Sequence, residues 1–262
     1  MVNGFWSWSL VVIVPVLLAA MIAAHEAGLR IHSRLRPASD IQDQGGSDDG
    51  FILSGVLGLL ALLMGFSFSM ALARLEDRRD LMLTETSAVG YLAMLAEGLP
   101  PERAAPLKAD LATYAAARLA AAEMADGPER LAAAQKATAL RAPLADKVRA
   151  ALRELPSGPL TVALAGAYDT VEDSAVRRQA LSQAHLPARV LWLLAAYATI
   201  SAAMLGYALA GARAQRRAAS ITLYLLIALA FAVILDLDRP RAGAITVDQT
   251  PFEEAVAGLA AG

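Results

Sequence analysis

Residues 62–80 read LLMGFSFSMALARLEDRRD, and the character of the chain changes within this stretch. It begins with apolar residues that suit the interior of a bilayer, passes through small and hydroxylated residues, and ends densely charged. Neither glycine nor proline occurs between residues 66 and 89. Because these two residues are the strongest helix breakers, we predict one continuous helix over residues 51–98, about 70 Å long at 1.5 Å per residue.

Composition indicates a membrane protein made of helices. Hydrophobic residues make up 57% of the 262 residues and charged residues only 18%, which is unusual for a soluble protein. Alanine and other strong helix formers dominate between the apolar stretches. Four stretches approach or reach the roughly 20 residues that cross a hydrocarbon core of about 30 Å. They are residues 5–24, 51–72, 190–210 and 219–235.

The order of these stretches predicts the domain organisation. We expect an all-α integral membrane protein with four transmembrane helices and a soluble helical bundle inserted between the second and the third. Several prolines would fit the first turn of new helices in the bundle, and Pro143 should break or kink one of them. The expected parts are a first helix pair at 1–72 with a connecting loop at 25–50, the bundle at 73–189, a second helix pair at 190–237, and a C-terminal segment at 238–262.

The C-terminal segment contains two expected elements. Residues 245–247 are typical of a short β segment. In the sequence TPFEEAVAGL, Thr250 would be the N-cap, Pro251 the first helical residue and Glu253 the capping-box partner. A short amphipathic helix should follow and dock on the bundle or on a neighbouring subunit.

Composition and motifs argue against several functions. The chain has no cysteine, which removes thiolate chemistry and zinc sites of the cysteine type. Its 23 basic and 25 acidic residues nearly balance, so we expect no nucleic-acid partner. Without a phosphate-binding loop, nucleophile elbow or HExxH motif, we expect no enzymatic activity, cofactor or metal. His25 is expected at the membrane interface, with a metal or proton role as the alternative.

A stripe of small residues follows one face of the second apolar stretch. One interpretation is close packing against another helix, which small residues permit in membranes. The other is that this face, or the adjacent one, lines a water-filled path. A similar stripe in the third stretch, which includes Gly206, favours tight packing in both. The stripe in the second stretch consists of Ser54, Gly58, Ala61, Gly65 and Ser69.

Two motifs resemble the bestrophin family. Gly65 and Phe66 are followed by Arg74, eight residues after the phenylalanine, on a transmembrane helix that runs on into a helical domain. This pattern resembles the bestrophin channels. Residues 235–243, LDLDRPRAG, resemble a signature of bacterial bestrophin-like membrane proteins. The order of parts is also similar: two spans, a helical insertion, two spans and a C-terminal segment.

The resemblance implies a ring-shaped homo-oligomer in the lipid bilayer, typically a pentamer, with an ion pore whose neck is formed by the second helices. Phe66 would match an aromatic neck position. Leu62 and Gly58 would lie one and two turns earlier, and Ser69 is a further pore-lining candidate. The ion would be an inorganic anion such as chloride.

The alternative is a non-conducting membrane scaffold or sensor whose helical bundle binds a partner protein. The orientation of three serines on the second span separates these two functions. A pore should turn Ser54, Ser67 or Ser69 towards a central axis, whereas a scaffold should bury them in dry helix contacts.

An even number of spans places both termini and the bundle on one side of the membrane. Arginines near the span ends occur on both sides, so the positive-inside rule does not decide which side this is. The bestrophin resemblance implies the cytoplasmic side of the inner (plasma) membrane, with a multi-pass topology.

The LDLDRP motif places two carboxylates at an unfavourable position. Asp236 and Asp238 lie at the C-terminal end of the fourth span, where the helix dipole disfavours negative charge. We hypothesise that Asp236 pairs with an arginine and so holds the fourth span to the long second helix, with a cation site as the alternative. The candidate arginines are Arg74, Arg78, Arg79, Arg239 and Arg241.

Overall fold

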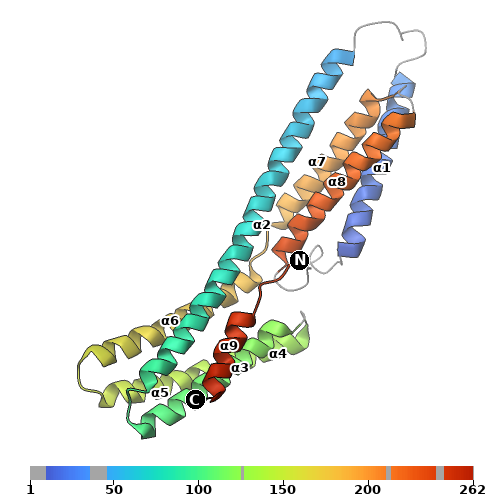
Figure 1. The fold of residues 1–262 in the computed structure, drawn as a ribbon. Helices are drawn as coiled ribbons and strands as arrows, with labels where there is room; N and C mark the ends of the chain where they lie inside the picture. The colour runs from blue at the N-terminus through green and yellow to red at the C-terminus, as the bar shows by residue number, and fades with distance from the viewer. Residues whose placement is uncertain (1–9, 36–45, 125–126, 211–213, 240–244, 262) are drawn as a thin grey trace. The chain divides into compact units, whose positions relative to one another are not determined.

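The computed structural model describes residues 10–35, 46–124, 127–210, 214–239 and 245–261 (Figure 1). These residues form helices and no strand, which confirms the all-α prediction. Residues 245–247 have irregular backbone, so the predicted β segment is wrong; no strand in the described part of the chain offers it a partner. The helices are α1 (Leu10–Leu35), α2 (Gly46–Ala96), α3 (Pro101–Glu123), α4 (Pro128–Ala139), α5 (Arg141–Glu154), α6 (Pro159–Gln183), α7 (Ala188–Ala208), α8 (Ala214–Asp238) and α9 (Thr250–Ala261).

Four of these helices are long and apolar enough to cross a membrane, which confirms the four predicted spans. Helix α1 continues past residue 24 to Leu35, and residues 5–9 of the predicted first span lie outside the described residues. The spanning helices are α1, α2 from Gly50 to Ala96, α7, and α8 from Arg217 to Asp238.

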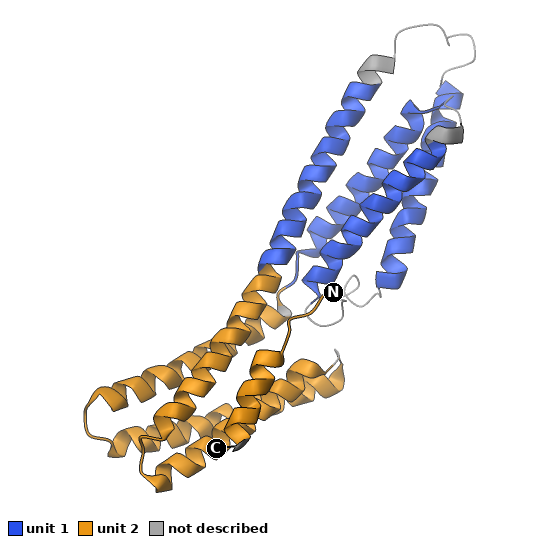
Figure 2. Ribbon diagram, viewed as in Figure 1, with its two compact units in different colours: residues 1–73, 185–239 blue, residues 74–184, 240–262 orange. Residues whose placement is uncertain are grey.

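The chain divides into two compact units (Figure 2). Unit 1 comprises residues 1–73 and 185–239, and therefore holds α1, the apolar part of α2, α7 and α8. Unit 2 comprises residues 74–184 and 240–262, and therefore holds the charged part of α2 with α3 to α6 and α9.

In unit 1, helix α1 packs along α7 and α8. Two glycines allow the backbones of α1 and α7 to approach closely. A Cβ on Gly206 would lie 2.1 Å from the carbonyl oxygen of His25, and a Cβ on Gly28 would lie 2.0 Å from that of Ala203. Neither position admits a side chain without a shift of backbone. The tight packing predicted for the third span is therefore confirmed at Gly206.

In unit 2, prolines begin three helices, as the sequence predicted. Proline is tolerated there because the N–H of the first helical residue has no acceptor within the helix. The predicted break also occurs. The chain turns at Leu140 between α4 and α5, and Pro143 lies in the first turn of α5, where it is tolerated. The prolines at helix starts are Pro101, Pro128 and Pro159.

The last helix, α9, docks on the bundle. This is one of the two predicted alternatives, the other being a neighbouring subunit. It packs against α3, and the side chain of Phe252 is fully buried in the core of unit 2. The predicted N-cap is displaced: Thr250 is already helical. The backbone N–H of Thr250 donates to Oδ1 of Asp248 at 3.0 Å, so Asp248 is the residue whose side chain caps the helix.

Candidate functional site

Helix α2 is a single helix of 51 residues, which confirms the prediction that the chain continues from apolar to charged sequence without a break. Gly90 is accommodated within it, and a Cβ there would meet nothing within 4 Å. The charged half of residues 62–80 is therefore positioned by the same helix that carries the apolar half.

The four pore-lining candidates share one exposed face of α2. Leu62 and Phe66 are 51% and 59% exposed, and Gly58 and Ser69 are exposed as well. At about 100° per residue the four positions fall within an arc of roughly 80°. The described helices of the same chain leave this face uncovered.

The opposite face of α2 is the one that the chain itself covers. Leu60, Met64, Ser67 and Ala71 are buried there. They fall within an arc of about 60° whose centre is roughly opposite that of the pore-lining candidates. Ser67 is 2% exposed, so this serine faces inward within one chain, and its hydroxyl donates to the carbonyl oxygen of Leu63 at 2.9 Å.

The small-residue stripe of α2 makes no close helix contact within the described chain. All five of its positions are exposed, and a Cβ on Gly58 or Gly65 would meet nothing within 4 Å. Tight packing predicted for this stripe is therefore not found within one subunit, in contrast to the stripe that includes Gly206. The hydroxyl of Ser54 donates to the carbonyl oxygen of Gly50 at 2.9 Å, a bond that leaves the side chain on the exposed face.

The three arginines after the apolar part of α2 have different environments. Arg78 is buried and its Nη2 donates to the carbonyl oxygen of Ala184 at 3.0 Å, so it joins α2 to the end of α6. Arg79 is exposed and Arg74 is half-buried. Pairing of Asp236 with one of them would join the two units and stays a prediction.

At the end of α8, Asp236, Asp238 and Arg239 are all buried. The carboxylate of Asp238 accepts the backbone N–H of Leu186 through both oxygens, at 2.9 and 3.0 Å, and lies 3.5 Å from Nδ1 of His185. These contacts place the second carboxylate of the motif beside the N-terminal end of α7, where the helix dipole favours negative charge. Arg241 lies outside the described residues.

A buried ion-pair cluster, which we call the Glu85 cluster, lies in unit 2. The side chain of Glu85 is 0% exposed. Its Oε1 accepts hydrogen bonds from Tyr114 Oη and Arg118 Nε, each at 2.7 Å. Its Oε2 accepts from Arg118 Nη2 at 2.9 Å and from Arg178 Nη1 at 2.8 Å. The carboxylate thus receives four donors from α3 and α6, which matches its acceptor capacity.

Arg178 extends this cluster to the segment that precedes α9. Its Nη2 donates to Oε1 of Gln249 at 2.9 Å. Its Cζ lies 5.4 Å from the ring centroid of Phe252, within the range of a cation–π interaction. One guanidinium therefore connects α2, α6 and α9.

The electrostatics of the cluster follow from one carboxylate facing two guanidinium groups. Burial alone would raise the pKa of Glu85, but hydrogen bonds and the charges of Arg118 and Arg178 outweigh it and lower the pKa to about 2. Burial, followed by the negative charge of Glu85, raises the pKa of Tyr114. Glu85 is therefore ionised and Tyr114 is a neutral donor at physiological pH.

Sequence comparison assigns the chain to a family. A family model described as the Bestrophin-like domain matches residues 20–252, which is most of the chain. The chain belongs to the bestrophin-like family. No curated protein shows significant sequence similarity to it.

Solved structures share the fold of this bestrophin-like chain. A variant of a bacterial bestrophin homologue from Klebsiella pneumoniae superposes with a TM-score of 0.71 at 14% identity, covering 97% of this chain and 98% of the other. A second variant gives 0.68 at 15% identity, covering 95% and 96%. A further structure of that homologue gives 0.65 at 15% identity, covering 94% and 95%.

Sequence reasoning missed the Glu85 cluster, although the bestrophin-like sequence carried a signal. Glu85 lies three residues after Met82 and four before Val89, and both belong to the apolar face of α2. An acidic residue within such a stripe indicates a buried charge that needs a partner. The sequence does not identify those partners, because they lie on other helices and their contacts with Glu85 depend on how the helices pack.

His25 packs between helices of unit 1, and its expected place at the membrane interface stays a prediction. It is buried, and its Nδ1 lies 2.8 Å from the hydroxyl of Tyr224 on α8. That hydroxyl also lies 3.3 Å from the carbonyl oxygen of Ala202 on α7. The described residues contain no group of three or more histidine, aspartate or glutamate side chains that could hold a metal ion. The polar pair therefore connects α1, α7 and α8.

Proposed function

We propose that this bestrophin-like chain forms a homo-oligomeric ion channel that conducts anions, with copies of α2 surrounding the pore. Gly58, Leu62, Phe66 and Ser69 would line its neck. The proposal depends on one observation: these four positions lie on a face of α2 that the described helices of the same chain leave exposed.

The composition of this face supports an assembled neck. Gly58 and Ser69 gain nothing from contact with lipid, because they bury little apolar surface there. Small and hydroxylated residues suit close helix contacts or water. Leu62 and Phe66, one turn apart, would supply a hydrophobic constriction of the kind that gates pores by dewetting.

The serines also favour the channel over the scaffold. Ser54 and Ser69 lie on the exposed face, whereas Ser67 lies on the buried one. Two of the three are thus available to a central axis in an oligomer. The anion preference and the pentameric ring are drawn from the bestrophin resemblance. From it we also propose the inner (plasma) membrane as the location, with the bundle and both termini in the cytoplasm.

Reconstitution tests the proposal directly. The purified full-length protein should run as an oligomer of defined mass in native mass spectrometry, with five subunits expected. Liposomes containing it should release chloride when a counter-ion pathway is supplied, and should not release potassium at a comparable rate. A monomer, or an intact oligomer without anion flux, would contradict the channel. The second of these outcomes would favour the scaffold.

A further inference from the structure

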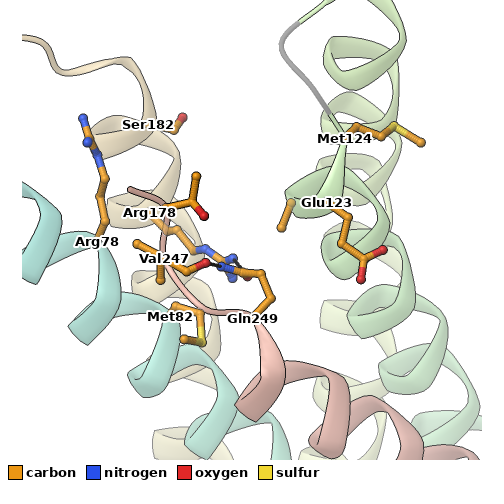
Figure 3. A pocket seen from close by; sticks show the side chains of 10 residues that line it. Arg78, Met82, Glu123, Met124, Arg178, Ser182, Val247 and Gln249 are labelled. Atoms are coloured by element: carbon orange, nitrogen blue, oxygen red, sulfur yellow. Dashed lines mark hydrogen bonds between the residues drawn. The ribbon is translucent and has the colours of Figure 1, made fainter. Parts of the chain in front are cut away.

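Helix α2 keeps the same buried face in its charged part. The buried residues there fall within an arc of about 140° whose centre is roughly opposite that of the pore-lining candidates. Two of them, Arg78 and Met82, line a cavity of about 300 Å³ with residues of α3, α6 and the segment before α9 (Figure 3). The buried residues are Arg78, Met82, Glu85, Ala88, Val89, Leu92, Ala93 and Ala96.

The exposed face of α2 also continues in phase. Seven further positions fall within the same arc of roughly 80° as Gly58, Leu62, Phe66 and Ser69, at about 100° per residue. Each of the seven is exposed, so the described helices of the same chain leave this face open as far as Met94. Together with the four pore-lining candidates they form a surface that we call the α2 strip. The seven positions are Ala73, Glu76, Asp80, Thr84, Ser87, Tyr91 and Met94.

Glu76 and Asp80 are the charged residues of the α2 strip. They follow Phe66 by ten and fourteen residues, which places them about 15 and 21 Å further along the helix axis. The other positions of the strip carry no charge. The first charged groups beyond the proposed neck on this face are therefore two carboxylates.

The arginines of this part of α2 lie outside the strip. Arg74, Arg78 and Arg79 are displaced from its arc by about 60° or more. Arg79 is the nearest, and its charge acts on the segment before α9. Hydrogen bonds from Thr250 lower the pKa of Asp248, and the charge of Arg79 adds to this effect. The α2 strip thus presents negative charge that no basic residue on the same face balances.

An oligomer would repeat these carboxylates around its axis. If copies of α2 surround a pore, each copy contributes Glu76 and Asp80 at the same two levels. Rings of aspartate and glutamate attract cations, whereas anion pores use rings of arginine or lysine. Low-dielectric walls strengthen such a field by focusing it. Chloride would therefore meet a repulsive ring on the C-terminal side of the neck.

We propose that Glu76 and Asp80 determine the charge preference of the proposed pore and restrict its anion flux. This inference rests on the proposed function, because only an assembly of α2 copies around a pore turns these carboxylates towards a common axis. The restriction is electrostatic, since the two side chains act through their charge. It therefore weakens as salt screens that charge.

Chloride efflux from liposomes that contain the full-length protein tests the two carboxylates. Glu76→Gln combined with Asp80→Asn removes both charges and preserves side-chain size. At about 0.01 M salt, where the Debye length is about 30 Å, we expect efflux to rise at least about threefold. At about 1 M salt the Debye length is only about 3 Å, and the two proteins should differ little. An equal rise at both salt concentrations would contradict an electrostatic role.

The matched control is Glu123→Gln combined with Glu129→Gln. It removes two exposed carboxylates from α3 and α4 and changes the net charge by the same amount, away from the α2 strip. Efflux should stay unchanged in this control. Unchanged efflux in both double variants would refute the role of Glu76 and Asp80 and leave the channel intact. No efflux from any of the three proteins would overturn the channel, and this inference with it.

Potassium efflux from the same liposomes measures the charge preference itself. The ratio of chloride to potassium efflux should rise when Glu76 and Asp80 are neutralised. An unmodified protein that releases potassium faster than chloride, with the order reversed in the double variant, would support the role of the carboxylates. That result would contradict the anion preference proposed above. An unchanged ratio would refute the inference.

The absence of cysteine from the chain permits a second test within one protein. In Asp80→Cys, the introduced thiol reacts with methanethiosulfonate reagents of positive, negative or neutral charge. Relative to the neutral adduct, the positive adduct should raise chloride efflux and the negative adduct should lower it. Glu123→Cys is the control and should respond to neither charge. Equal efflux with the positive and the negative adduct at residue 80 would contradict the proposal.

Discussion

Glu85 and Arg118 form a bidentate ion pair inside unit 2, with Nε···Oε1 at 2.7 Å and Nη2···Oε2 at 2.9 Å. Glu85→Gln would leave Arg118 and Arg178 buried without a compensating charge. We expect a loss of about 3–5 kcal/mol in the free energy of unfolding, the usual result of removing one partner of a buried pair. Chemical denaturation in detergent measures it.

The matched control for this substitution is Glu154→Gln, which also removes a carboxylate that pairs with an arginine, Arg103. That pair is exposed, so solvent screens it and the variant should unfold almost as the unmodified protein does. Equal destabilisation by the two substitutions would contradict the assigned role of Glu85.

The pKa of Glu85 also predicts how stability depends on pH. The pKa falls from 4.5 to about 2 on folding, so the unfolded chain binds the proton more tightly. The stabilisation from this group is therefore complete above about pH 4.5 and is lost as the pH falls towards 2. Unfolding temperatures measured across this window should fall less steeply in Glu85→Gln. The same slope in both proteins would show that other carboxylates dominate acid unfolding.

Gly206→Ala should destabilise unit 1, because its Cβ would lie 2.1 Å from the backbone carbonyl oxygen of His25. Backbone cannot move aside as a flexible side chain does, and we expect a cost of about 1–3 kcal/mol. Gly65→Ala is the control, since a Cβ there meets nothing within 4 Å. Gly65→Ala should not lower the unfolding temperature of the subunit. A fall as large as that caused by Gly206→Ala would contradict the close packing of α1 against α7.

Asp238→Asn should weaken the junction between α8 and α7. The substitution replaces a carboxylate that accepts the Leu186 N–H through both oxygens by an amide with one acceptor oxygen. Hydrogen bonds to charged groups contribute about 1.5–3 kcal/mol, and we expect a loss within that range. Asp80→Asn, at an exposed position, is the control. The unfolding temperature in detergent distinguishes the two variants.

Phe66→Ala tests the proposed neck. If Phe66 narrows the pore, its removal should raise chloride flux through reconstituted protein by widening a hydrophobic constriction. Phe68→Ala removes the same side chain from another side of α2, about 200° around the helix. It should leave flux unchanged. A larger effect of Phe68→Ala would contradict the proposed neck and indicate that another face of α2 lines the pore.

Sequence alone determined the elements that depend on local composition. Apolar length predicted four spans, and the absence of breakers after Phe66 predicted the long helix α2. Prolines located the starts of three bundle helices, and two short motifs indicated the family. These features are readable because they depend on helix propensity and on the thickness of a bilayer, which act over neighbouring residues.

Tertiary structure decided every feature that depends on which faces meet. Two similar stripes of small residues proved different: Gly206 contacts α1, whereas Gly58 lies open. Asp238 accepts the N–H of Leu186, a residue far away in sequence, and Glu85 receives its donors from two other helices. Periodicity shows that a residue lies on a face. Only tertiary packing determines which residue of another helix contacts that face, because sequence spacing within one helix carries no information about the other.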